Sequence, residues 1–169
     1  NGDNQITNDD RYFRNFRPDF TFGFGMNLSY KKASLSTFFR GQYGGQVYNG
    51  LLLTSGYIDR ARPNNTNSLT NVLDFNNGAA DPNFLDNAGN VKFSDYYLED
   101  ASFIRCESIS LGYDFGTLVG GATLNASLNV NNAFLITKYS GRDPENFGGI
   151  DHNFYPRPQS YTFGINIDF

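Results

Sequence analysis

The sequence predicts an all-β fold of antiparallel strands that cross a membrane, and three observations support this prediction. Aromatic residues make up 17% of the chain and stand in a polar, Gly-rich background, which suits short alternating strands better than packed helices. Apolar and polar residues alternate with period two in five segments, as in strands with one apolar and one polar face. Short turns and long loops alternate between these segments, which is typical of transmembrane β-barrels.

The first two strands are expected within residues 19–32 and 33–45. Even-numbered positions from Phe20 to Tyr30 are apolar, and the odd-numbered positions between them are polar or Gly. A turn near Lys31 and Lys32 would join the two strands as an antiparallel hairpin. The apolar run is about 30 Å long at roughly 3.3 Å per residue, and a tilt near 40° reduces its height to about 23 Å, close to the apolar band of such barrels.

A long loop is expected from about Tyr48 to Asp100. This stretch is dense in Asn, Asp, Gly and Pro and keeps no sustained period. Loops beyond about 12 to 15 residues are uncommon in compact soluble domains, whereas long loops are ordinary on the outer side of a membrane barrel. The length of this stretch therefore favours the barrel.

The third and fourth strands are expected within residues 101–115 and 123–134, with a short turn near Gly120 and Gly121. In the third, Arg105 and Glu107 fall on the same parity as the later apolar residues, so we interpret its first half as projecting beyond the lipid. Cys106 then falls on the inward parity, as a small buried residue. A second long loop over residues 138–158 precedes the fifth strand, residues 159–169.

Composition and motifs exclude several classes of protein. The net charge of −4 does not indicate a nucleic-acid-binding protein. A single cysteine excludes an internal disulfide and a cysteine-based metal cluster. No apolar run approaches the length of a membrane helix. The only histidine, His152, lacks an arrangement typical of nucleophilic catalysis, and the adjacent Glu99 and Asp100 would point to opposite faces of a strand. We therefore expect no enzyme activity.

Several blocks of the sequence resemble the C-terminal part of the SusC/RagA family of TonB-dependent outer-membrane transporters. The blocks are NGDNQITNDDR, PDFTFGFGMNLSY, LSTFFRGQYGGQVYN, YYLEDASFIRCESISLGYDF, NNAFLITKYSGRDPE and YPRPQSYTFGINIDF. The resemblance runs over nearly the whole chain. It implies a 22-stranded barrel filled by an N-terminal plug, the import of glycans or peptides with energy passed on by TonB, and a surface lipoprotein of the SusD type as a lid.

By this resemblance, residues 1–169 form the C-terminal segment of such a barrel in the cell outer membrane. About five strands are present, whereas the plug, the TonB box and the earlier strands are missing, so we expect no transport by this chain alone. The implied partners are the remainder of the barrel and plug, the SusD-like lipoprotein, TonB through the missing N-terminal part, and lipid and lipopolysaccharide. The chain is expected to be complete at its C-terminus and truncated at its N-terminus.

The last strand is similar to the terminal signal that the outer-membrane assembly machinery reads. Tyr161 to Phe169 alternates apolar and polar residues up to the final position. The spacing of the terminal signal is matched by four residues, namely Thr162, Gly164, Ile167 and Phe169. In the complete barrel this strand would pair with the first one and hide both edges.

The opening residues resemble the end of a calcium-binding loop. Asn1, Asp3, the Gln5 carbonyl and Asp10 would supply hard oxygen ligands for Ca²⁺ at the alternate positions of that motif. The match is partial, because the first Asp would precede residue 1 and Asn4 replaces the turn glycine. The alternative is an acidic loop that binds no ion.

Aromatic and charged residues outside the strands give further candidates. Arg11, Arg14 and Arg17 alternate with aromatic residues before the first strand and could hold lipopolysaccharide phosphates, or could form a solvated rim. Tyr30 and Tyr43 are expected to anchor the hairpin at the membrane interfaces. Candidates for contact with a substrate or with the lid are Tyr57, Tyr96, Tyr97, Arg142, Asp143, His152 and Tyr155. Each of these residues could instead serve only to pack the loops.

Two function classes remain open at this point. The first is nutrient import through a lumen lined by polar residues, among them Asn27, Arg40, Gln42 and Asn129. The alternative is a small secreted or surface β-sandwich whose Tyr-rich loops bind carbohydrate. A sandwich would have to pack the apolar faces of its sheets on each other.

Overall fold

A computed structural model of the chain describes residues 12–55, 95–118, 120–146, 148–152 and 155–169. The chain divides into two compact units. The sheet unit consists of residues 18–44, 102–138 and 155–169. The loop unit consists of residues 1–17, 45–101 and 139–154.

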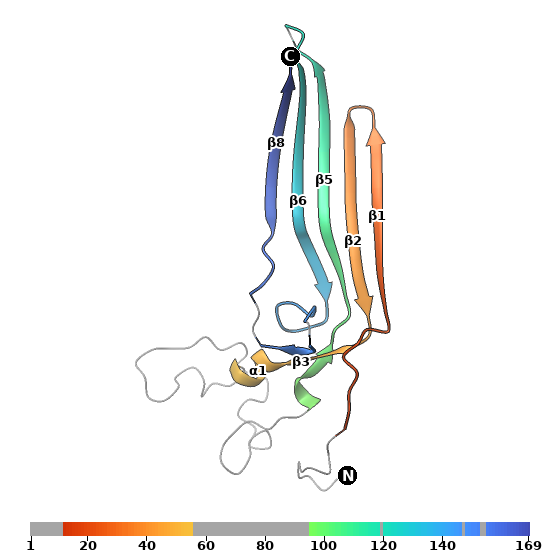
Figure 1. The fold of residues 1–169 in the computed structure, drawn as a ribbon, viewed down its shortest axis with the longest axis vertical. Helices are drawn as coiled ribbons and strands as arrows, with labels where there is room; N and C mark the ends of the chain where they lie inside the picture. Colours follow the sequence, from red (N-terminus) through yellow and green to blue (C-terminus); the bar gives the residue numbers. More distant parts are fainter. Residues whose placement is uncertain (1–11, 56–94, 119, 147, 153–154) are drawn as a thin grey trace, which may run out of the picture. The chain divides into compact units, whose positions relative to one another are not determined.

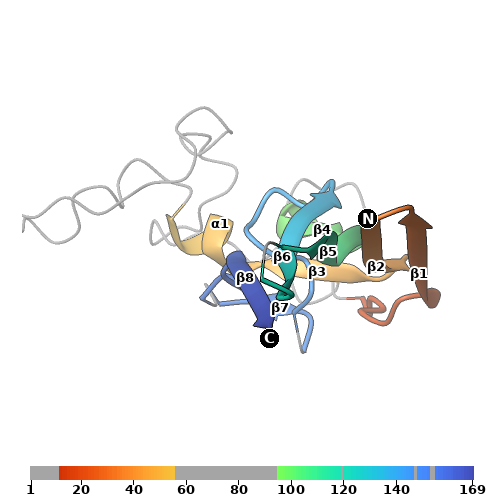
Figure 2. The same ribbon diagram turned by 90° about the horizontal axis from the view of Figure 1, so that it is seen from above.

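The sheet unit is one layer of five antiparallel strands, as Figure 1 and the end-on view of Figure 2 show. In order across the sheet they are β1 (Phe20–Tyr30), β2 (Ala33–Tyr43), β5 (Phe103–Thr117), β6 (Thr123–Thr137) and β8 (Ser160–Asp168). Short turns join β1 to β2 and β5 to β6 at the same end of the sheet (Figure 1). The prediction of about five antiparallel strands with short turns at one end is confirmed.

The register across the sheet separates two faces. One row of paired residues is apolar and consists of Leu28, Leu35, Leu111, Leu128 and Phe163. The next row is polar and consists of Asn27, Ser36, Ser110, Asn129 and Thr162. Because neighbouring residues of a strand point to opposite sides, these rows lie on opposite faces. Period-two alternation in the sequence therefore becomes an apolar face and a polar face that each extend over all five strands.

A β-bulge corrects the faces expected for residues in the first half of β5. The register with β2 shifts between Phe38 and Phe39, and the register with β6 shifts at Glu107. An extra residue in a strand reverses the parity beyond it. Arg105 therefore pairs with Arg40 of the polar face, whereas Cys106 pairs with Phe39 of the apolar face. The simple alternation had assigned both residues to the wrong face.

The loop unit contains regular structure where the sequence analysis expected only loops. Its elements are β3 (Gln46–Asn49), α1 (Gly50–Ser55), a 3-10 helix (Asp95–Tyr97), β4 (Leu98–Asp100) and β7 (Ile150–Asp151). β3 pairs antiparallel with β4 and parallel with β7, so that three short strands form a second sheet. The expectation of structureless loops is wrong at these positions, because elements this short carry no sustained period.

Buried apolar side chains are concentrated in the loop unit. They are Val47, Leu51, Tyr97, Ala101 and Tyr139. In the sheet unit only Phe103 and Cys106 are buried among the described hydrophobic residues, and large apolar side chains of all five strands are exposed. Within the described ranges, no helix has the length and apolar character needed to span a membrane.

Candidate functional site

The apolar face of the sheet carries a band of aromatic contacts. Phe24 stacks on Phe39 with ring centroids 4.9 Å apart, and Phe39 meets the edge of Phe134 at 6.1 Å. Farther along, Phe163 and Ile165 of β8 are 67% and 60% exposed. Monomeric soluble proteins rarely expose a continuous apolar surface of this extent. The face is therefore suited to an apolar environment such as lipid.

The polar face carries the residues that the sequence analysis assigned to a lumen. Asn27 pairs with Ser36, and Asn129 belongs to the same polar row. Arg40 and Gln42 follow Ser36 at even positions along β2, so they share its face. The structure thus brings the four expected lumen residues onto one surface of hydrogen-bonding groups.

A cluster of charged side chains at the bulge was missed by the sequence analysis. The carboxylate of Glu107 accepts a hydrogen bond from Arg40 Nε and lies 3.8 Å from both Arg105 Nε and Arg157 Nη1. Arg105 is only 2% exposed, and its Nη1 donates to Asn132 Oδ1 at 2.8 Å. Asn132 has a positive φ of 51°, a conformation that Asn tolerates better than most residues. A period-two pattern carries no signal for this cluster, since both strands depart from regular pairing here.

Small residues leave an open hollow on the polar face near the short turns. Gly112 and Gly164 lie opposite Ser34 and Ser127, and a Cβ at Gly164 would lie 2.8 Å from the hydroxyl of Ser127. These residues line an open hollow of about 510 Å³.

A polar network holds the loop unit together. The carboxylate of Glu99 accepts hydrogen bonds from Asn49 Nδ2 at 2.7 Å and from the backbone N and the Oγ of Ser140, both at 2.7 Å. Close by in sequence, the Tyr139 hydroxyl donates to Asp151 Oδ2 at 2.6 Å, and both side chains are buried. Burial, followed by the hydrogen bond to the Asp151 carboxylate, raises the pKa of Tyr139. The hydroxyl therefore stays protonated at neutral pH.

The candidate contact residues of the loops have different surroundings. Tyr97 is buried at 1% exposure and meets the rings of Tyr48 and Tyr96 with centroids 5.9 Å and 5.2 Å away. Its ring is thus a core element rather than an open stacking platform. Tyr96 is 37% exposed at the surface of the same 3-10 helix.

The remaining contact candidates lie in the second loop. Arg142, His152 and Tyr155 are exposed. Asp143 Oδ1 accepts a hydrogen bond from the backbone N of Glu145. Candidates outside the described residues are Tyr57 and the calcium-loop positions Asn1, Asp3, Gln5 and Asp10. No three His, Cys, Asp or Glu side chains among the described residues are grouped as a metal site.

The four residues of the terminal signal lie in or beside β8. Thr162 and Gly164 belong to the polar face, where they pair with Asn129 and Ser127. Ile167 has the opposite parity and is 47% exposed, and Phe169 follows the strand with its ring fully exposed. The end of β8 is therefore apolar and aromatic, and Ile167 lies on the face that carries the apolar band.

Comparisons with known proteins agree with this two-faced sheet. No protein-family model matches the chain. The TonB-dependent receptor SusC of Bacteroides thetaiotaomicron is 31% identical over 179 aligned residues, which cover 100% of this chain and 17% of SusC. The TonB-dependent receptor P3 of Formosa agariphila is 29% identical over 90% of this chain and 16% of the receptor. The chain thus spans about a sixth of the length of these relatives.

Solved structures give the same result for the fold. The RagAB peptide importer in its open-open state matches 98% of this chain and 19% of the solved chain, with a TM-score of 0.67 and 25% identity. Its closed-closed state matches with the same TM-score at 24% identity. None of these proteins is named as an enzyme, in agreement with our expectation for this chain. The chain is therefore a SusC/RagA-like segment of a TonB-dependent receptor, and its five-stranded sheet is a piece of that family's β-barrel.

Proposed function

We propose that this chain forms part of the barrel wall of an outer-membrane receptor that imports a nutrient with energy from TonB. The observation that supports the proposal best is the register of the sheet, which places an unbroken apolar row and an unbroken polar row on opposite faces. The apolar face meets lipid, and the polar face lines the lumen. The relatives, which are TonB-dependent receptors, support the same role.

In this mechanism the polar face guides the substrate after capture at the cell surface. Asn27, Gln42 and Asn129 offer amide groups that donate and accept hydrogen bonds. Such groups bind glycan hydroxyls and peptide amides equally well, so the substrate class proposed is a glycan or a peptide. The energy would come from TonB. TonB and the plug would act through parts of the receptor that lie N-terminal to this chain.

Exposed residues outside the five long strands are proposed to contact the substrate or a SusD-like surface lipoprotein. The strongest candidates by exposure are Tyr155, at 91%, and Tyr96, at 37%, together with Arg142 and His152. A Tyr155→Ala variant of the receptor is expected to weaken either substrate binding or co-purification of the lipoprotein. Retention of both would remove Tyr155 from the proposed contact surface.

The calcium loop also stays a proposal. Its test is the melting temperature of the intact receptor with added Ca²⁺ and with a chelator. A higher melting temperature with Ca²⁺ that is lost in the Asp3→Asn, Asp10→Asn variant would support ligation by this loop. Identical melting under both conditions would remove it.

The alternative of a secreted β-sandwich needs a second layer over the apolar face. Apolar side chains of β1, β5 and β8 are instead exposed in the structure, for example Phe24 at 53% and Leu111 at 45%. The exposure of this face therefore favours the barrel wall over the sandwich.

The decisive experiment uses the receptor that contains this chain in its native host. We expect the receptor in the outer-membrane fraction, and we expect its deletion to abolish growth on one glycan or one peptide as the sole nutrient. Restoring the gene should restore growth, whereas a copy with this segment deleted should not. Recovery of the receptor from the soluble fraction would refute the barrel wall, and unaffected growth on all tested glycans and peptides would refute the import function.

A further inference from the structure

The segment directly before β1 combines arginine and aromatic residues that the import function leaves unused. Residues 12–17, here called the entry segment, read YFRNFR. They contain no acidic residue, although the chain as a whole has a net charge of −4. The entry segment is therefore a local concentration of positive charge on an acidic protein.

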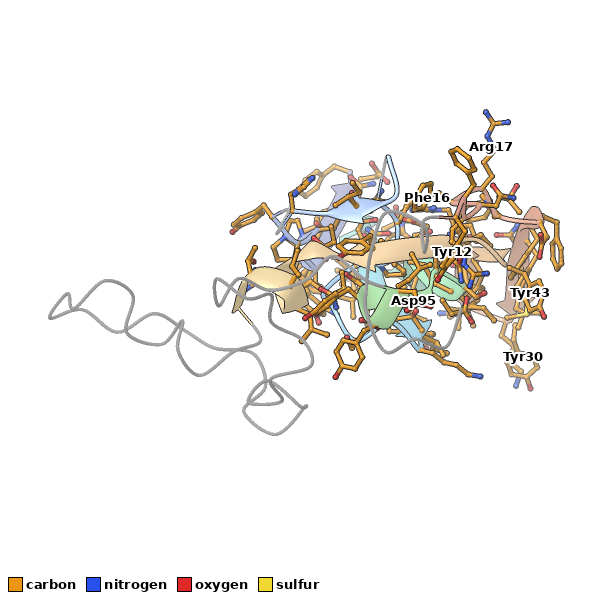
Figure 3. The ribbon with its side chains drawn as sticks, turned by 90° about the horizontal axis from the view of Figure 1, so that it is seen from below. Tyr12, Phe16, Arg17, Tyr30, Tyr43 and Asp95 are labelled. Carbon is orange, nitrogen blue, oxygen red and sulfur yellow. The ribbon has the colours of Figure 1, made fainter. Side chains whose placement is uncertain are left out.

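The arginines of the entry segment are exposed, and among the described residues no carboxylate pairs with them. The guanidinium of Arg14 lies over the ring of Tyr12, 4.5 Å from its centroid. Tyr12 is itself held by a hydrogen bond of 2.5 Å from its hydroxyl to Asp95 Oδ2. Figure 3 shows Tyr12 beside Asp95 and the side chain of Arg17 extending away from the ribbon. Within the described part of the chain, no ion pair involves Arg14 or Arg17.

Aromatic residues accompany these charges. Phe13 is fully exposed, and Phe16 is 44% exposed. The ring of Phe16 covers Gly149, where a Cβ would clash with it. An exposed Phe beside an unpaired guanidinium suits a boundary between an apolar and a charged phase.

Chain connectivity limits the distance between the end of the entry segment and the start of β1. Arg17 stands three residues before Phe20, so its Cα lies within about 11 Å of the start of β1. Phe20 stacks on Tyr43 at 5.5 Å, and the backbone N of Asp19 donates to the carbonyl of Tyr43. This end of the hairpin is opposite the short turn and therefore faces the outer side in a membrane barrel.

The opposite end of the same hairpin uses lysine. Lys31 Nζ lies 5.3 Å from the ring centroid of Tyr30, and Lys32 Nζ donates to the carbonyl of Phe115 at 3.2 Å. Lysine is a point charge, whereas the planar fork of arginine matches two oxygens of one phosphate. The outer end of the hairpin is thus the end equipped for phosphate.

We propose that Arg14 and Arg17 bind the phosphate groups of lipid headgroups in the outer leaflet, with Phe13 in the adjoining apolar layer. This inference rests on the proposed membrane location. It adds a lipid-binding site at the rim, distinct from the polar face along which the substrate passes.

The test measures lipid A binding to the intact receptor in a non-ionic detergent. The probes are lipid A with both phosphates and the same lipid A after phosphatase treatment. The double variant Arg14→Gln, Arg17→Gln loses two charge-assisted hydrogen bonds. We expect it to bind phosphorylated lipid A about tenfold or more weakly than the original receptor does. The control Lys31→Gln, Lys32→Gln removes the same charge at the other end and should leave the affinity within about twofold of the original.

Four results would overturn the proposal. The first three are equal binding of dephosphorylated lipid A, an unchanged affinity in the Arg14→Gln, Arg17→Gln variant, and displacement of lipid A by equally low concentrations of inorganic phosphate, which would indicate a free-anion site. The fourth concerns the Arg14→Lys, Arg17→Lys variant, which retains the charge and should bind more tightly than the Gln variant; an equally large loss of affinity would refute recognition by charge. Outer-membrane location and uptake should be normal in all variants, so failure of this proposal is separable from failure of the import function.

Discussion

The loop unit and the sheet unit place their apolar side chains in opposite environments. In the loop unit, Val47, Tyr97 and Tyr139 are each at most 5% exposed and form an ordinary buried core. In the sheet unit, Phe24, Phe163 and similar residues are more than half exposed, although the strands are the most regular part of the chain. The region with long regular strands therefore lacks a core of its own, and the region with short irregular elements has one.

This contrast indicates two different solvents. A buried core and a satisfied polar network, as around Glu99, are what stabilises a structure in water. An exposed apolar face with every interior strand fully hydrogen-bonded is what a bilayer requires. The two units should therefore respond differently to the same kind of substitution.

The largest effect is expected from a charge on the apolar face of the sheet. Val130 and Asn129 are neighbours on β6 and lie on opposite faces. Val130→Lys should lower the free energy of unfolding in lipid vesicles by about 2 to 4 kcal/mol, since Val130 is at the middle of β6. Asn129→Lys, the matched control on the polar face, should change it little. Urea titration of the folded receptor measures both, and equal losses would contradict the two-faced sheet.

The next effect tests the loop unit. Glu99→Ala removes one of the two acceptors of Asn49 Nδ2, the other being Ser140 Oγ, and leaves one N–H of this 1% exposed side chain unsatisfied. The expected loss is about 1 to 3 kcal/mol of local stability. Hydrogen exchange should show faster opening of β3 and β4 with unchanged protection in β5 and β6. Glu99→Gln, which keeps an acceptor, should lose less; uniform loss over both units would show that they unfold together.

The difference between the units also explains which features could be predicted from the sequence and which could not. The five long strands and their faces follow from alternation, as in the even positions from Phe20 to Tyr30. The face of Arg105 was wrong, because a bulge depends on the partner strand and leaves no mark in a period-two pattern. The short elements of the loop unit depend on contacts distant in sequence, such as that between Asn49 and Ser140, so no local pattern reveals them.

An effect of similar size is expected from glycines inside the sheet. Gly41 is buried, and a Cβ there would clash with the Phe103 carbonyl and lie 2.6 Å from the Phe22 ring. Gly41→Ala should therefore destabilise the sheet by about 1 to 3 kcal/mol. Gly25→Ala is the control, because its nearest neighbour, the Thr37 carbonyl, would lie at an ordinary 3.6 Å. Urea titration distinguishes the two, and equal stability would contradict close packing at Gly41.

The last effect depends on pH and should be confined to the loop unit. Burial and the hydrogen bond to Asp151 raise the pKa of Tyr139 above its ordinary value of 10.0. The folded unit therefore holds this proton to higher pH than the unfolded chain does, so its stability should fall as pH rises above about 10. At neutral pH, Tyr139→Phe should be less stable by about 1 to 3 kcal/mol, because the buried Asp151 loses a donor.

Above pH 10 the two proteins should converge, since the original chain loses its advantage as the unfolded tyrosine ionises while the variant has no such group. Limited proteolysis of the loop unit across this pH range measures the gap between them. A gap that stays constant with pH would show that the hydroxyl is not held in its protonated form by the fold. A parallel loss of sheet protection would show that the polar network stabilises both units rather than the loop unit alone.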